Sequence, residues 1–174
     1  MVLTVIIHYD EIGLKGKNRP FFERALCRNT RFCLEELGRD RFRVRPIFGR
    51  ILLEFEKEES WERIQAGLRR VFGIAYFGRS WRCERSMGSI CEKALEILPN
   101  TQGLSFRVRS SRSDKTFPLK SPEIDREVGA EIKRRRNWRV NLTSPDLTLY
   151  VTVMSKEAYV SLEKIRGPGG LPTG

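Results

Sequence analysis

A short basic stretch, FRVRSSRSDKTFPLKS, carries the residues of this chain that are best suited to binding a polyanion. It begins with alternating apolar and charged residues, as a strand does, and ends at a Ser-Pro pair that is typical of a helix start. Its candidate cations are Arg109, Arg112, Lys115 and Lys120. Cations on a strand-to-helix connection could clamp phosphates, while Phe117 could touch a ribose or a base. The alternatives are a solvated basic loop and a Phe117 side chain that fills the core.

Two other basic segments could serve the same role. The run KRRR ends a helical pattern whose first turns are acidic, an arrangement that also complements the helix dipole, so both interpretations remain open. A glycine-rich loop after the first strand could hold a phosphate or extend an RNA surface, or it could be a solvated turn. That loop has neither the P-loop spacing nor the GxGxxG spacing of nucleotide-binding motifs. These segments supply the remaining candidates, which are Lys133, Arg134, Arg135, Arg136, Lys15, Lys17 and Arg19.

Charge is the strongest signal in the composition. The 174 residues include 33 Lys and Arg against 22 Asp and Glu, which gives a net charge of +11. Residues 103–139 alone carry 11 cations and 5 anions, so more than half of the excess lies in about a fifth of the chain. A surplus of this kind favours a polyanionic partner, either a nucleic acid or an acidic membrane surface.

Residues for catalysis or metal binding are scarce. The four cysteines, Cys27, Cys33, Cys83 and Cys91, lack metal-ligand spacing, and the single histidine, His8, cannot complete a zinc site. We interpret all five as core residues, and no catalytic triad can be assembled. The chain has no apolar run of membrane-spanning length and no signal-peptide pattern, which favours a cytoplasmic protein. We therefore expect no catalytic residue, no metal and no cofactor in this chain.

The first 80 residues follow the order strand, helix, strand, strand, helix, strand. Pro20 falls in the first turn of the first helix, Ser60 is placed to cap the second, and Gly38 and Gly73 are placed to end them. The order is that of the ferredoxin-like βαββαβ arrangement, an α+β fold. The expected elements are strand 2–8, a helix from about 18, strands 42–48 and 51–56, a helix from 61, and strand 74–82.

A second, smaller α/β unit is expected to follow. Ser121 is predicted to be the N-cap of its second helix, with Pro122 at the first helical position. The last residues, 167–174, are rich in Gly and Pro and are predicted to form a linker. The expected elements are helix 87–98, strand 104–110, helix 122–137, strand 140–142, and a hairpin of strands 147–154 and 158–165.

Three stretches resemble a known family. YDEIGLKGKNRPFFERAL, FRVRSSRSDKTFPLKSPEIDREVGAEI and the tail KIRGPGGLPTG are similar to the N-terminal half of tRNA uridine 4-sulfurtransferases, enzymes that also serve thiamine biosynthesis in many bacteria. The resemblance implies a ferredoxin-like domain at residues 1–81, a THUMP RNA-binding domain at 82–166 and a linker at 167–174. In that family the tail leads to a pyrophosphatase domain that binds ATP and carries the catalytic cysteine. No cysteine of this chain matches that residue.

The resemblance implies a tRNA-binding module rather than a complete enzyme. Such a module would grip the acceptor stem and the 3′ end of tRNA, and present it for ATP-dependent 4-thiouridine formation by a pyrophosphatase domain in cis or in trans. One rival hypothesis is a self-sufficient, nucleotide-dependent RNA-modifying enzyme that uses the glycine-rich loop. The other is a module that binds a protein or a membrane surface.

Overall fold

The computed structural model describes residues 3–10, 12 and 15–172, and these form two compact units. The first unit comprises the chain up to Arg79 together with the C-terminal segment from Lys164, and the second comprises Ser80–Glu163. Each unit has its own hydrophobic core, so each is described by itself. No helix in the described ranges is both long and apolar enough to cross a lipid bilayer.

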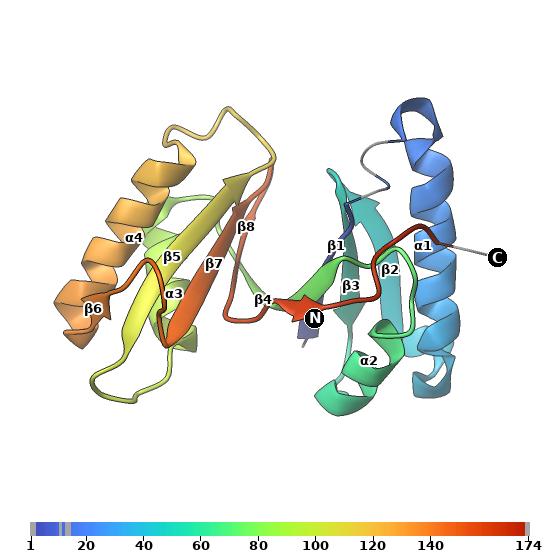
Figure 1. The fold of residues 1–174 in the computed structure, drawn as a ribbon, viewed down its shortest axis with the longest axis horizontal. Coiled ribbons are helices and arrows are strands. Elements are labelled where there is room, and N and C mark those ends of the chain that lie inside the picture. The colour runs from blue at the N-terminus through green and yellow to red at the C-terminus, as the bar shows by residue number, and fades with distance from the viewer. Residues whose placement is uncertain (1–2, 11, 13–14, 173–174) are drawn as a thin grey trace. The chain divides into compact units, whose positions relative to one another are not determined.

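The first unit is built on a sheet in the order β2-β3-β1-β4 (Figure 1). Its strands are β1 (Leu3–His8), β2 (Phe42–Ile47), β3 (Arg50–Phe55) and β4 (Tyr76–Cys83). β3 pairs antiparallel with both β1 and β2. With the helices between them, this order is the ferredoxin-like arrangement that the sequence predicts. The expected α+β class is therefore confirmed.

Two helices cover one face of this sheet, α1 (Arg19–Cys33) and α2 (Trp61–Leu68) (Figure 1). The hydroxyl of Ser60 accepts a hydrogen bond from the backbone N–H of Arg63, which confirms Ser60 as the N-cap of α2. α1 ends at Cys33 and not at Gly38 as the sequence indicates. Two short 3-10 turns follow it, Glu35–Leu37 and Arg39–Arg41, with Gly38 between them. A third 3-10 turn, Gly16–Asn18, leads into α1. Leu26 and Ile64 anchor the helices in the core.

The second unit is a mixed sheet in the order β8-β7-β5-β6, and the last residues of β4 pair with β8. β5 runs parallel to both β6 and β7, while β7 and β8 form the expected antiparallel hairpin. Two helices lie against one side of this sheet (Figure 1). The elements are α3 (Met87–Ile97), β5 (Ser105–Arg112), α4 (Ser121–Arg136), β6 (Arg139–Val140), β7 (Leu147–Val153) and β8 (Ala158–Ser161).

α4 begins one residue earlier than the sequence indicates. Its N-cap is Lys120, which makes no side-chain capping bond, so Ser121 is the first helical residue and Pro122 the second. The predicted cap at Ser121 is therefore wrong. Proline is tolerated at the second position for the same reason as at the first, because none of the first four N–H groups of a helix has an intrahelical partner.

The C-terminal segment is tied to the first unit by backbone pairing. β9 (Ile165–Arg166) pairs antiparallel with β4, so the predicted strand 158–165 is two separate strands. The N–H of Gly167 donates to the carbonyl of Ala75 at 2.9 Å, and that of Gly73 donates to the carbonyl of Gly169 at 2.8 Å. The described part of the predicted linker is therefore held in place by hydrogen bonds.

Candidate nucleic-acid interface

The connection between β5 and α4, residues 113–120, is the centre of the basic stretch. The Ser113 N–H and hydroxyl both donate to the carbonyl of Val153, at 2.9 and 3.3 Å. The Asp114 carboxylate accepts a bond from the Thr116 N–H at 2.8 Å, which closes a tight turn. Hydrogen bonding by Thr116, with smaller contributions from Arg85 and Arg112, holds the pKa of Asp114 below its usual value. The first half of this loop therefore has a defined conformation.

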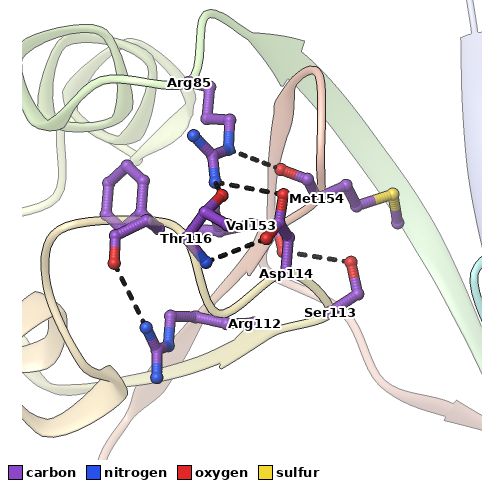
Figure 2. Close-up of polar contacts among 8 residues, drawn as sticks. Arg85, Arg112, Ser113, Asp114, Thr116, Val153 and Met154 are labelled. Atoms are coloured by element: carbon purple, nitrogen blue, oxygen red, sulfur yellow. Dashed lines mark hydrogen bonds and ion pairs between the residues drawn. The ribbon is translucent and has the colours of Figure 1, made fainter.

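Arg85 reaches over this loop from the segment between β4 and α3 (Figure 2). Its Nε donates to the carbonyl of Met154 at 2.8 Å, and its Nη2 donates to the hydroxyl of Thr116 at 2.9 Å. The same nitrogen lies 3.4 Å from a carboxylate oxygen of Asp114. The planar guanidinium thus joins the loop to the end of β7. Sequence reasoning missed Arg85, which belongs to no basic run and is 31 residues away from Thr116.

Phe117 lies inside the loop rather than on its surface. Its side chain is 4% exposed and belongs to the core of the second unit. The backbone carbonyl of Phe117 accepts a bond from Arg112 at 3.3 Å (Figure 2). This position agrees with the core-filling alternative, and an RNA contact by the ring would require the loop to open. Arg112 belongs to β5 and is partly buried. Its hydrogen bond to Phe117 therefore ties the loop to this strand.

Three of the four cations in the basic stretch are exposed: Arg109, Lys115 and Lys120. Lys120 is the N-cap of α4, where the free N–H groups of the first turn add partial positive charge. Nearby, burial raises the pKa of Asp125, against hydrogen bonds from Ser110 and the charge of Arg109. The loop therefore presents exposed positive charge on an ordered backbone, which suits the binding of phosphates.

The run at the end of α4 divides into two kinds of residue. Arg136 donates to the carbonyl of Leu95 at 2.7 Å and to the side-chain oxygen of Asn100 at 2.8 Å, so it satisfies the last turn of α3. Arg134 and Arg135 pair with Glu131 within the same helix, with their side chains 65% and 58% exposed. Lys133 is exposed as well. Arg136 is thus a structural residue, while the other three keep an accessible charge.

The cations near the N-terminus belong to the first unit. Lys15 and Lys17 are exposed, and the Nζ atom of Lys15 lies 5.7 Å from the centre of the Phe22 ring. Arg19 donates to the Tyr9 hydroxyl at 3.1 and 3.2 Å and pairs with Glu23 at 3.0 Å. Gly13, on which the nucleotide-binding alternative partly depends, lies outside the described residues.

Burial displaces the pKa values of three cysteines and of the single histidine. Burial raises the pKa of Cys27 and of Cys83 to about 11 and also raises that of Cys91, so these thiols stay protonated at neutral pH. Burial lowers the pKa of His8 to about 3, and the charges of Arg50 and Lys164 act in the same direction. His8 is stacked on Tyr76 with ring centres 4.2 Å apart, which is the setting of a structural histidine.

Comparison with known families assigns each unit separately. The ThiI ferredoxin-like domain matches residues 4–78, and the THUMP domain matches residues 84–163. The fold and its basic loop therefore define a protein of the ferredoxin-like and THUMP class. The chain corresponds to the N-terminal portion of the tRNA sulfurtransferase family.

Relatives of known name agree with this assignment. A probable tRNA sulfurtransferase of Moorella thermoacetica is 36% identical over 175 residues, covering 100% of this chain and 44% of the relative. One from Brevibacillus brevis is 38% identical over 174 residues, covering 98% of this chain and 43% of the relative. The chain thus spans less than half the length of these relatives.

Solved structures show the same fold. The crystal structure of PH1313 from Pyrococcus horikoshii superposes with a TM-score of 0.87 and 32% identity, covering 99% of this chain and 58% of that one. A 4-thiouridine synthetase crystallised with RNA and bound ATP has a TM-score of 0.75 and 27% identity. That comparison covers 100% of this chain and 44% of the synthetase chain.

Proposed function

We propose that this chain binds tRNA, and that the β5–α4 loop grips the acceptor end of the tRNA through phosphate and shape contacts. The observation that carries the proposal is an ordered loop that is held by bonds to Arg85 and Val153 and by the buried Phe117. Arg109 of β5 and the loop residues Lys115 and Lys120 stay exposed. A loop backbone that is already ordered loses little conformational entropy on binding, which favours a specific phosphate grip over a diffuse basic patch.

Two further facts support an RNA partner. A-form duplexes are recognised mainly by backbone positions and shape, because their major groove is too deep and narrow to be read, and a basic platform suits that task. The 4-thiouridine synthetase that shares this fold was crystallised with RNA. The acceptor stem with its 3′ end is the proposed contact because it gives a fixed reference point from which a distant uridine can be presented.

We further propose that this chain supplies binding and not chemistry. Burial raises the pKa of Cys27, Cys83 and Cys91, which favours the inert thiol form of these three residues over the reactive thiolate. ATP-dependent 4-thiouridine formation would fall to a pyrophosphatase domain, in cis or in trans, and the bound ATP would belong to that domain. A cytoplasmic location is part of this proposal. The test is that the purified chain alone forms no thiouridine and hydrolyses no ATP.

The binding proposal is tested by titrating the chain with tRNA over a series of salt concentrations. If about four to six phosphates are neutralised, log K against log salt should have a slope of roughly −3 to −5. Lys115→Ala and Lys120→Ala should each weaken binding by about 1–2 kcal/mol and reduce the size of the slope by about 1. Lys156→Ala is the matched control, an exposed lysine of the same unit in the β7–β8 turn. A slope near zero would contradict the proposed phosphate contacts.

The acceptor-end contact needs its own arm of the titration. Intact tRNA should bind more tightly than tRNA trimmed of its 3′ end, and an acceptor minihelix should bind better than an unrelated duplex of equal length. If trimming changes nothing and the two duplexes bind equally, RNA binding stands but the acceptor end is not what the loop holds.

A further inference from the structure

The turn between β2 and β3 holds a phenylalanine where backbone sterics disfavour one. Two residues, Phe48 and Gly49, join the paired residues Ile47 and Arg50. Their φ angles are 36° and 82°, and two successive positive φ values characterise the type I′ hairpin turn. The first position of that turn favours Asn, Asp or Gly, since a bulky side chain there is strained. Backbone geometry therefore does not explain Phe48.

Burial does not explain this residue either. The side chain of Phe48 is 66% exposed, and it belongs to neither of the two hydrophobic cores. The strained backbone costs the folded state free energy, and an exposed ring contributes little burial to offset that cost. Departures of this kind from local preference cluster at functional sites.

The side chain of Arg19 packs against this turn. A Cβ atom on Gly49 would lie 2.6 Å from the Nη2 atom of Arg19, so the guanidinium packs directly against the turn backbone. Arg19 is fixed there by its bonds to Tyr9 and Glu23. Lys17, two residues before Arg19, is exposed in the 3-10 turn that leads into α1. An exposed aromatic ring thus stands beside positive charge on the first unit.

We propose that Phe48 stacks on an unpaired base of the bound RNA while Lys17 and Arg19 face the adjacent phosphates. The inference rests on the proposed RNA binding and adds a second contact site, on the other unit from the β5–α4 loop. An aromatic platform beside a cationic track is the general design for holding single-stranded nucleotides. Because every base has a π-face, the contact would be tolerant of sequence. Docking of a protein segment on the ring is the rival that the test must separate.

Phe48→Asn is the informative variant because it separates function from folding. Asn suits the first position of a type I′ turn, so the melting temperature should rise or hold. Loss of the stacked ring should weaken tRNA binding by about 5- to 150-fold, the range measured for one base stacked on an aromatic side chain. The slope against salt should not change, because the ring carries no charge. A merely structural phenylalanine would instead lower the melting temperature and leave affinity intact.

Two further variants complete the test. Phe48→Trp should restore binding, and its fluorescence should be quenched by tRNA after subtraction of the response of the unsubstituted chain, which has three tryptophans. Phe32→Asn is the control, since Phe32 is 71% exposed on α1 of the same unit, and affinity should not change. If Phe48→Asn binds tRNA as the unsubstituted chain does, or Phe48→Trp shows no quenching, the stacking proposal is wrong. If the unsubstituted chain does not bind tRNA, the proposed function fails first.

Discussion

The guanidinium of Arg85 lies over the ring of Phe117, with 5.3 Å between its Cζ atom and the ring centroid. Because Arg85 also binds Thr116 and Met154, one side chain fixes both the buried and the exposed parts of the β5–α4 loop (Figure 2). The affinity of the loop for phosphate should therefore depend on Arg85, although Arg85 is less exposed than the loop lysines.

Replacing Arg85 should loosen the β5–α4 loop and weaken tRNA binding through that loss of order. Arg85→Ala should increase hydrogen exchange at the Thr116 amide and weaken tRNA binding several-fold. Arg85→Lys should rescue little, since an ammonium cannot reproduce a fork of donors aimed at separate acceptors. If Arg85→Lys binds tRNA normally, Arg85 acts as a simple charge and not as a support. Arg82→Ala is the control, as an exposed arginine three residues earlier.

Phe117→Ala should act on stability. Removing a buried aromatic side chain typically costs about 3–5 kcal/mol, and the second unit would lose that amount from its core. Thermal or denaturant unfolding followed by a probe in the second unit measures the loss. Weaker tRNA binding without any loss of stability would instead show that the ring contacts RNA.

The run at the end of α4 should divide by function when each residue is replaced alone. Arg136→Ala should lower the free energy of unfolding by roughly 1–3 kcal/mol, because it leaves the Leu95 carbonyl without its charged donor. Lys133→Ala, its neighbour in the same run, should leave stability nearly unchanged. Equal effects of the two replacements on the denaturation midpoint would contradict this division.

Stability should fall in mild acid through His8. Its pKa is about 3 when folded and about 6.5 in an unfolded chain, so the unfolded state binds the extra proton between those values. This contribution to stability is complete above pH 6.5 and is lost as the pH falls. At pH 5 the loss should be roughly 1–2 kcal/mol relative to pH 7.5, reduced by partial solvent access. His8→Phe, which keeps a ring against Tyr76, should flatten the pH profile in this window. If the stability of His8→Phe changes with pH as that of the unsubstituted chain does, His8 does not titrate as described.

Local patterns predicted the elements of both units because periodicity and capping act over a few residues. The core face of β2, for example, follows from alternation, and Ser60 from its place before an apolar helical stripe. Phe117 remained ambiguous in the sequence because burial depends on how a loop folds back. Arg85 could not be found at all, since its partners Thr116 and Met154 are 31 and 69 residues away. The strain at Phe48 appears only once φ is known.

The two units differ in how the chain builds them: one is a continuous segment and the other is made of two segments. The chain passes into the second unit within β4 and returns to the first between Glu163 and Lys164, where β9 pairs with the start of β4. The second unit is therefore a single continuous insertion, anchored to the first at both of its ends. The first is discontinuous and is completed only when the returning segment is in place. Cutting the chain after Glu163 would thus remove part of the ferredoxin-like unit while leaving the β5–α4 loop intact.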